Sequence, residues 1–103
     1  MIRTLARSLL TVAALSAAHN AAATDDYTKE LFALYCTACH AVKASGAPQA
    51  FTREWNDRMD QGIDTLVNHA INGIRNMPPM GTCAECSEED LHNIIVYMAQ
   101  EEQ

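Results

Sequence analysis

The sequence has no apolar run long enough to span a bilayer. Its longest, residues 9–18, is interrupted by Thr11 and Ser16, and it falls well short of the roughly 18 to 20 residues that a membrane-spanning helix needs. Basic residues are also scarce and form no stripe, which excludes a nucleic-acid-binding surface. There is no internal repeat and no linker that would divide two domains. The sequence therefore predicts a single domain without stable membrane insertion once any leader is removed.

Arg3 and Arg7 precede this apolar run, and Ala21-Ala22-Ala23 follows it. A basic start, a short apolar centre and small residues before a cleavage point are typical of a secretory signal peptide. We therefore expect residues 1–23 to be a signal peptide and residues 24–103 to be a mature domain in the periplasm. Two of the seven Lys and Arg lie in the leader, which leaves five against thirteen Asp and Glu and a formal charge of −8. Such an acidic domain favours partners with a basic docking face.

The run Cys36-Thr37-Ala38-Cys39-His40 matches C-x-x-C-H, the motif at which haem is covalently attached. Residues three and four apart on a helix share a face, so each thiol can meet one of the two haem vinyl groups while His40 reaches the iron. The motif occurs once, which predicts one haem c, with its iron, per chain. A zinc knuckle, a thioredoxin-like pair and a simple disulfide are the alternatives for C-x-x-C alone, and the adjoining histidine disfavours them.

A methionine is the expected second iron ligand. A haem that transfers electrons usually has its sixth coordination position filled by the protein, and a thioether there raises the reduction potential. Met77 precedes Pro78 and Pro79, which cannot lie within a helix and bias Met77 toward an extended backbone. This favours Met77 over its competitor Met80. The other Met and His residues are expected elsewhere: Met59, Met98, His69 and His92 in helical stretches, and His19 in the leader.

Four helical stretches are expected, and no part of the mature chain is typical of a strand, so the predicted fold class is all-α. The first begins at a cap on Asp25 or Asp26 and runs into the haem motif. The second begins at Thr52, the third ends near residues 73–76, and the fourth begins with a capping box at Ser87 and Asp90. The expected buried faces are Tyr27, Leu31, Leu34 and Tyr35 in the first helix; Ile63, Leu66, Val67, Ala70, Ile71 and Ile74 in the third; and Leu91, Ile94, Ile95 and Met98 in the last.

In this order, the C-x-x-C-H run and Met77-Pro78-Pro79 resemble the class I c-type cytochromes. More narrowly, residues 76–87 (NMPPMGTCAECS) resemble the small bacterial cytochromes of the c-five type. The resemblance implies a small cytochrome c fold, with about four helices wrapped around one covalently attached haem. It also implies that Met77, before the paired prolines, is the axial ligand. Position 80 is commonly Lys in that family, so Met80 departs from the pattern.

The resemblance implies further roles for matching residues. The Pro48 carbonyl would accept the N–H of the proximal imidazole, and Trp55 and Arg58 would lie at the haem edge and satisfy propionate oxygens. Core packing for Trp55 and solvation for Arg58 are the alternatives. The family also carries a disulfide at the place of Cys83 and Cys86, which have only each other once haem takes Cys36 and Cys39.

The function implied is that of a periplasmic monohaem cytochrome, a one-electron carrier between respiratory redox partners such as membrane-bound oxidases or reductases. It would be a monomer or weak dimer and not an enzyme. A small haem peroxidase or haem-based ligand sensor is the alternative, and it would need an exchangeable sixth ligand. An exported zinc module, binding one metal through both C-x-x-C pairs, would leave His40 and Met77 without a role.

Overall fold

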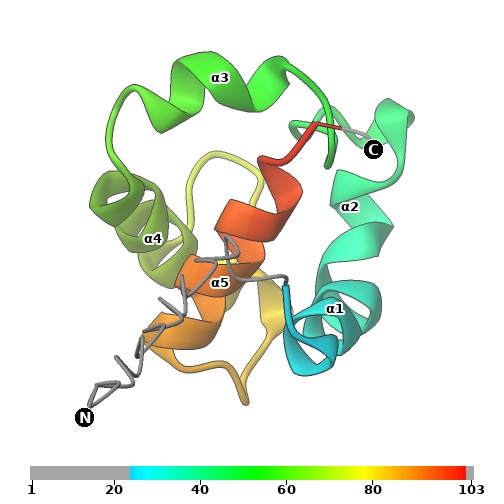
Figure 1. Cartoon of the computed structure of the whole chain (residues 1–103), viewed down its shortest axis with the longest axis vertical. Helices are drawn as coiled ribbons and strands as arrows, with labels where there is room; N and C mark the ends of the chain where they lie inside the picture. The colour runs from blue at the N-terminus through cyan, green and yellow to red at the C-terminus, as the bar shows by residue number, and fades with distance from the viewer. Residues whose placement is uncertain (1–23, 102–103) are drawn as a thin grey trace, which may run out of the picture.

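The chain folds as short helices packed against one another, and the computed structural model describes residues 24–101. In chain order the helices are α1 (Asp26–Leu31), η1 (Phe32–Cys36), α2 (Thr37–His40), η2 (Lys43–Ser45), α3 (Glu54–Met59), α4 (Ile63–Asn72), η3 (Pro79–Thr82) and α5 (Glu88–Met98) (Figure 1). Strand pairing in this part of the chain is limited to one isolated bridge between Ile74 and Met77. The all-α expectation is therefore confirmed. The signal peptide expected over residues 1–23 lies outside the described residues, among which no helix has the length and apolar character to cross a bilayer.

The first three helical segments follow one another without a break up to the end of the haem motif. Asp25 caps α1 as expected, because its carboxylate accepts the Thr28 N–H at 2.7 Å. The middle segment, η1, is a π-helix with wider turns than an α-helix. The wider turns change which side chains face inward, so Phe32 is buried and Leu34 is 64% exposed. Tyr27 is 51% exposed, so the predicted buried face is wrong at Tyr27 and Leu34.

The second and third predicted helices are α3 and α4, with changes at their ends. Thr52 lies one residue before the N-cap of α3, which is Arg53, so the cap predicted at Thr52 is displaced. The Thr52 hydroxyl still accepts the Glu54 N–H at 3.4 Å. Helix α4 ends at Asn72 because Gly73, with φ +81°, turns the chain out of the helix. Ile74, predicted to lie on the apolar face of this helix, therefore lies beyond it.

Helix α5 begins with the predicted capping box. The Ser87 hydroxyl accepts the Asp90 N–H at 3.0 Å, and the Asp90 carboxylate accepts the Ser87 N–H at 2.9 Å. All four residues of the predicted apolar face are buried, namely Leu91, Ile94, Ile95 and Met98. This helix packs against both α4 and α1, so it connects the segment that contains the haem motif with the later helix α4.

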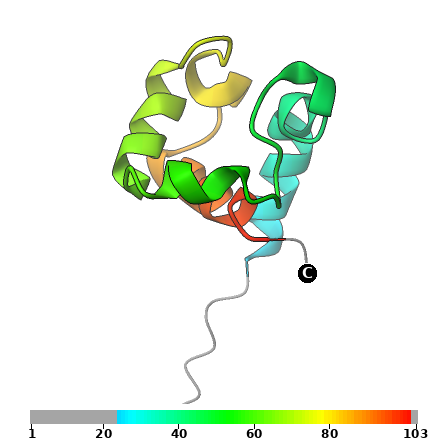
Figure 2. The ribbon, with the colours of Figure 1, turned by 90° about the horizontal axis from the view of Figure 1, so that it is seen from above.

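The core surrounds α5, where this helix meets α1, η1 and α4. Leu31 and Ile94 are 1% and 2% exposed, and beside them three aromatic rings meet edge to face. The ring centroids of Phe32, Phe51 and Tyr97 lie 4.9 to 5.7 Å apart, within the range of favourable aromatic pairs. This packing fixes the haem motif relative to α5. In Figure 2, α2 lies at the upper right of the fold and η3 lies across from it at the upper left.

Candidate haem-binding site

The two cysteines of the haem motif lie at the end of η1 and within α2. Cys36 is half-buried, Cys39 is exposed, and neither forms a disulfide. Burial, with a smaller contribution from Cys39, raises the pKa of the Cys36 thiol to about 11. The Cys36 sulfur is therefore protonated at neutral pH. Two free thiols one helical turn apart fit the covalent attachment of haem.

The imidazole of His40 is buried and held by one ring nitrogen. Its Nδ1 lies 2.8 Å from the carbonyl oxygen of Pro48, and a carbonyl can only accept, so Nδ1 carries the proton. The neutral ring then keeps the lone pair of Nε2 for a metal. The backbone supports the same arrangement, because the Ala50 N–H donates to the His40 carbonyl at 2.8 Å. His40 thus has the tautomer that an iron ligand requires.

Trp55 and Arg58, both on α3, already have protein partners. The Trp55 ring packs beside His40 with 5.8 Å between ring centroids, and its indole N–H donates to the Gln49 carbonyl at 2.9 Å. Arg58 donates to the Glu54 carbonyl at 2.5 Å. Trp55 is buried in the core. Contact of either residue with haem propionates stays a prediction. The single indole N–H of Trp55 would have to exchange or share the Gln49 carbonyl, whereas the guanidinium of Arg58 has further N–H groups.

A tight loop after α4 holds the backbone of Met77. The Met77 N–H donates to the Ile74 carbonyl at 2.8 Å, and the Ile74 N–H donates to the Met77 carbonyl at 3.1 Å. Gly73 makes room for this loop: a Cβ there would lie 2.9 Å from the Met77 oxygen and 3.0 Å from the Pro79 nitrogen. Both distances are shorter than a normal contact. The sequence segment that carries Met77 is thus fixed by backbone bonds on one side and by close packing on the other.

Met80 lies three residues further on, in a backbone conformation that residues other than glycine rarely adopt. Met80, Gly81 and Thr82 have φ values of +63°, +55° and +69°, and the left-handed region is strained for residues with a Cβ. The Met77 methyl group lies over Gly81, since a Cβ at Gly81 would be 3.1 Å from it. Both methionines are half-buried and pack against the core. The segment η3, which contains Met80, also contacts η1.

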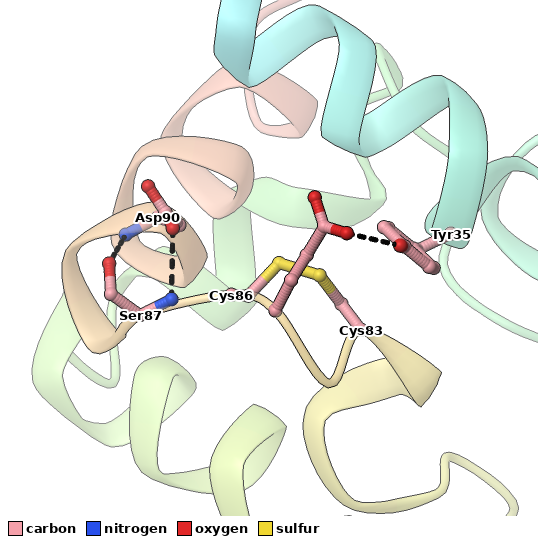
Figure 3. The surroundings of a disulfide bond; sticks show 6 residues. Tyr35, Cys83, Cys86, Ser87 and Asp90 are labelled. Carbon is pink, nitrogen blue, oxygen red and sulfur yellow. Dashed lines mark hydrogen bonds between the residues drawn. A yellow bond between two sulfur atoms is a disulfide. The ribbon is translucent and has the colours of Figure 1, made fainter.

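A disulfide between Cys83 and Cys86 follows η3, with an S–S distance of 2.00 Å (Figure 3). Both cysteines are buried, and the loop between them leads directly to the cap of α5. Within that loop Glu85 accepts a hydrogen bond from the Tyr35 hydroxyl at 2.7 Å. This bond, and to a lesser degree burial, raises the pKa of Tyr35 above its ordinary value. The residue before Cys36 is therefore linked to the loop that follows the methionine segment.

Sequence reasoning missed three residues that shape this site. Tyr35 was assigned to a buried helical face, whereas its hydroxyl bonds to Glu85. Gly73 is predicted only as part of a helix end, although a glycine shortly before a proline pair can signal close backbone approach. Gln49 was not singled out, and its position next to Pro48 was the only available signal. Its contacts depend on the folded loop.

The chain is similar to several known proteins. The model of the family described as "Cytochrome C oxidase, cbb3-type, subunit III" matches residues 23–98. Cytochrome c5 of Ectopseudomonas mendocina is 40% identical over 89 residues, which cover 84% of this chain and 98% of the relative. A mono-heme ferrocytochrome c from Shewanella putrefaciens has a similar structure, with a TM-score of 0.64 and 33% identity over 79% of this chain and 100% of its own. A chain in the crystal structure of an electron transfer complex of nitrite reductase with cytochrome c gives a TM-score of 0.67 and 29% identity, covering 75% of this chain and 95% of that one.

Proposed function

The chain belongs to the class I c-type cytochromes, of the c5 type, which carry covalently bound haem c, and on this premise we propose that it is a periplasmic one-electron carrier between respiratory redox partners. The haem supplies the one-electron redox chemistry when bound. The residues of the chain tether the haem and ligate its iron. We further propose that the protein is not an enzyme, because ligands from the chain on both sides of the iron leave no position for a substrate.

The observation that carries this proposal is the state of His40 beside two free thiols. We propose that Cys36 and Cys39 form the thioether bonds and that His40 ligates the iron through Nε2. The 2.8 Å contact between Nδ1 and the Pro48 carbonyl supports this assignment, because it places the proton of the neutral ring on Nδ1 and keeps the lone pair of Nε2 for the iron. A ring that is held on its other nitrogen also keeps one orientation in both oxidation states, so little rearrangement accompanies electron transfer.

We propose Met77 as the sixth ligand in preference to Met80. Both backbone groups of Met77 are bonded to Ile74, so its thioether starts from a fixed point. Met80 has a left-handed backbone, which is strained for a residue with a Cβ. Its thioether therefore starts from a less favourable backbone conformation. The Cys83–Cys86 disulfide would hold the far end of the same segment.

Paired substitutions test the ligand. In the oxidised protein, Met77→Ala should abolish the weak near-infrared charge-transfer band of Met-ligated haem and lower the reduction potential, because a thioether raises it. Met80→Ala removes the same side chain three residues away and should leave the band in place. The opposite pattern would move the assignment to Met80.

Attachment and coordination are tested on the purified protein. Haem should stay with the polypeptide in acidified acetone, and Cys36→Ala or Cys39→Ala should each remove one thioether bond, which the pyridine haemochrome spectrum reports. The reduced protein should not bind carbon monoxide at neutral pH. Ready carbon monoxide binding would instead favour the haem peroxidase or ligand sensor.

The location and the partners are part of the same proposal. Export to the periplasm follows from the leader expected over residues 1–23, and cell fractionation with detection of the covalent haem tests it. The similar cytochrome that forms an electron transfer complex with nitrite reductase supports redox enzymes as partners for this chain. The negative charge of the mature domain favours basic docking faces on those enzymes. Recovery of the protein in the cytoplasm would contradict the proposed location.

A further inference from the structure

Gln49 bonds to several parts of the loop that surrounds His40. Its side-chain nitrogen Nε2 lies 3.0 Å from the Cys39 carbonyl oxygen, 3.1 Å from that of Val42 and 2.9 Å from that of Ala47. An amide nitrogen has two hydrogens, so the three carbonyls share them. One of these carbonyls belongs to the residue directly before His40.

The backbone of Gln49 is bonded as well. Its carbonyl accepts the Trp55 indole N–H at 2.9 Å and the Thr52 hydroxyl at 2.7 Å. Its N–H donates to the Glu54 carboxylate at 2.6 Å. The residue therefore connects the chain just after the haem motif with the beginning of α3.

This placement constrains the contact between His40 and Pro48 from both sides. Pro48 precedes Gln49 in the chain, so the bonds that fix Gln49 also fix the direction of the Pro48 carbonyl. The bond to the Cys39 carbonyl fixes the backbone next to His40. The Trp55 ring, held through its N–H by the Gln49 carbonyl, packs against the imidazole.

We propose that Gln49 is a positioning residue that sets the length and direction of the hydrogen bond from His40 Nδ1 to the Pro48 carbonyl, and through it the reduction potential. The inference rests on the proposed ligation of iron by His40. A stronger bond at Nδ1 makes Nε2 a better electron donor and stabilises the oxidised metal. Loosening this bond therefore raises the potential.

The test uses the holoprotein and three variants. Gln49→Leu removes the donating nitrogen without adding charge. Gln49→Lys restores hydrogen-bond donors, and Gln61→Leu makes the same change at an exposed turn. The readouts are the exchange rate of the His40 Nδ1 proton, followed by NMR in the reduced state, and the reduction potential of the uncharged variants.

Gln49→Leu should speed the exchange by about tenfold, as expected for the loss of a hydrogen bond of ordinary strength. It should shift the redox equilibrium constant about threefold toward the reduced state. This corresponds to a rise of about 28 mV in the reduction potential, at 59 mV per tenfold for one electron. Gln49→Lys should return the exchange rate toward that of the natural protein, and Gln61→Leu should change neither quantity. If Gln49→Leu does not assemble, Gln49→Glu keeps the size, replaces the donor by an acceptor and should also speed the exchange.

A Gln49→Leu protein that is less stable but has unchanged proton exchange and potential would overturn the inference, since Gln49 would then be only structural. Failure of the ligand proposal is distinguishable, because the natural protein would then lack the haem-shifted NMR signals of a ligating His40.

Discussion

At the residue scale, the hydrogen bond from Tyr35 to Glu85 makes stability depend on alkaline pH. Only the protonated phenol donates, and the pKa of Tyr35 in the folded protein is raised above the ordinary value of 10.0. The bond therefore contributes fully below about pH 10, the unfolded value, and its contribution is lost as the pH rises through the folded pKa. Tyr35→Phe should be less stable than the natural protein at neutral pH, and the two should converge in strongly alkaline solution. Denaturant unfolding at a series of pH values measures the difference, and a gap that persists unchanged at high pH would contradict the assignment.

The site residues that the sequence predicts are those that belong to a short motif. Cys36, Cys39 and His40 lie within five consecutive residues, and Met77 is followed directly by its two prolines. Gln49 could not be identified, because the carbonyls that it bonds come together only after the loop folds around His40. The relation between Tyr35 and Glu85 joins residues 50 positions apart, and no local pattern reports such a contact.

At the scale of elements, Gly73 decides whether the Met77 loop can lie against the end of α4. Gly62 is a matched control, since its φ of +93° and ψ of +141° are close to the +81° and +152° of Gly73 and an added Cβ would meet open space. Gly62→Ala should lower stability by about 1 to 3 kcal/mol through backbone strain alone. Gly73→Ala adds a clash with backbone atoms, which costs about 1 to 3 kcal/mol more. It should also weaken the charge-transfer band, whereas Gly62→Ala should not. Chemical denaturation and the oxidised spectrum measure both effects, and equal behaviour of the two variants would show that the clash is relieved elsewhere.

The cap of α5 offers a second prediction at this scale. Ser87→Ala removes the acceptor of the Asp90 N–H and should cost about 1 kcal/mol, whereas Ser87→Gly should cost only about a few tenths. The comparison separates the cap from the haem site, so both variants should keep the natural spectrum. Thermal unfolding of the two variants provides the measurement, and no difference between them would mean that the reciprocal bond from the Ser87 N–H to Asp90 carries the cap.

The elements differ in how far the sequence predicts them, and the reason is the range of their determinants. Helix α5 was predicted with its cap and its buried face, because the capping box and the apolar spacing are local. The π-helical segment η1 was not, because a wider turn depends on which carbonyl each N–H reaches in the packed structure. That single change explains why Leu34 is exposed and Phe32 takes the inner position.

At the scale of the whole molecule, charge governs how partners meet it. Residues 24–103 have a formal charge of −8, and the one ion pair among the described residues, Arg53 with Glu101, is 4.0 Å long and exposed. Electron transfer to an acceptor with a basic face should therefore slow as salt is added, because screening shortens the range of attraction to about 10 Å at 0.1 M. Stopped-flow rates at increasing ionic strength give the measurement. A rate that does not change with salt would show that charge does not guide the encounter.

The two ends of the described chain lie together. The Gln100 side-chain amide donates to the Thr24 hydroxyl at 3.3 Å, and Figure 2 shows the start of α1 and the end of α5 on the side opposite η2 and η3. A unit with neighbouring ends can be inserted into a longer polypeptide with little disturbance. A host protein could thus be joined at both ends of this unit, and η2 and η3 would remain on the side that faces away from the fusion.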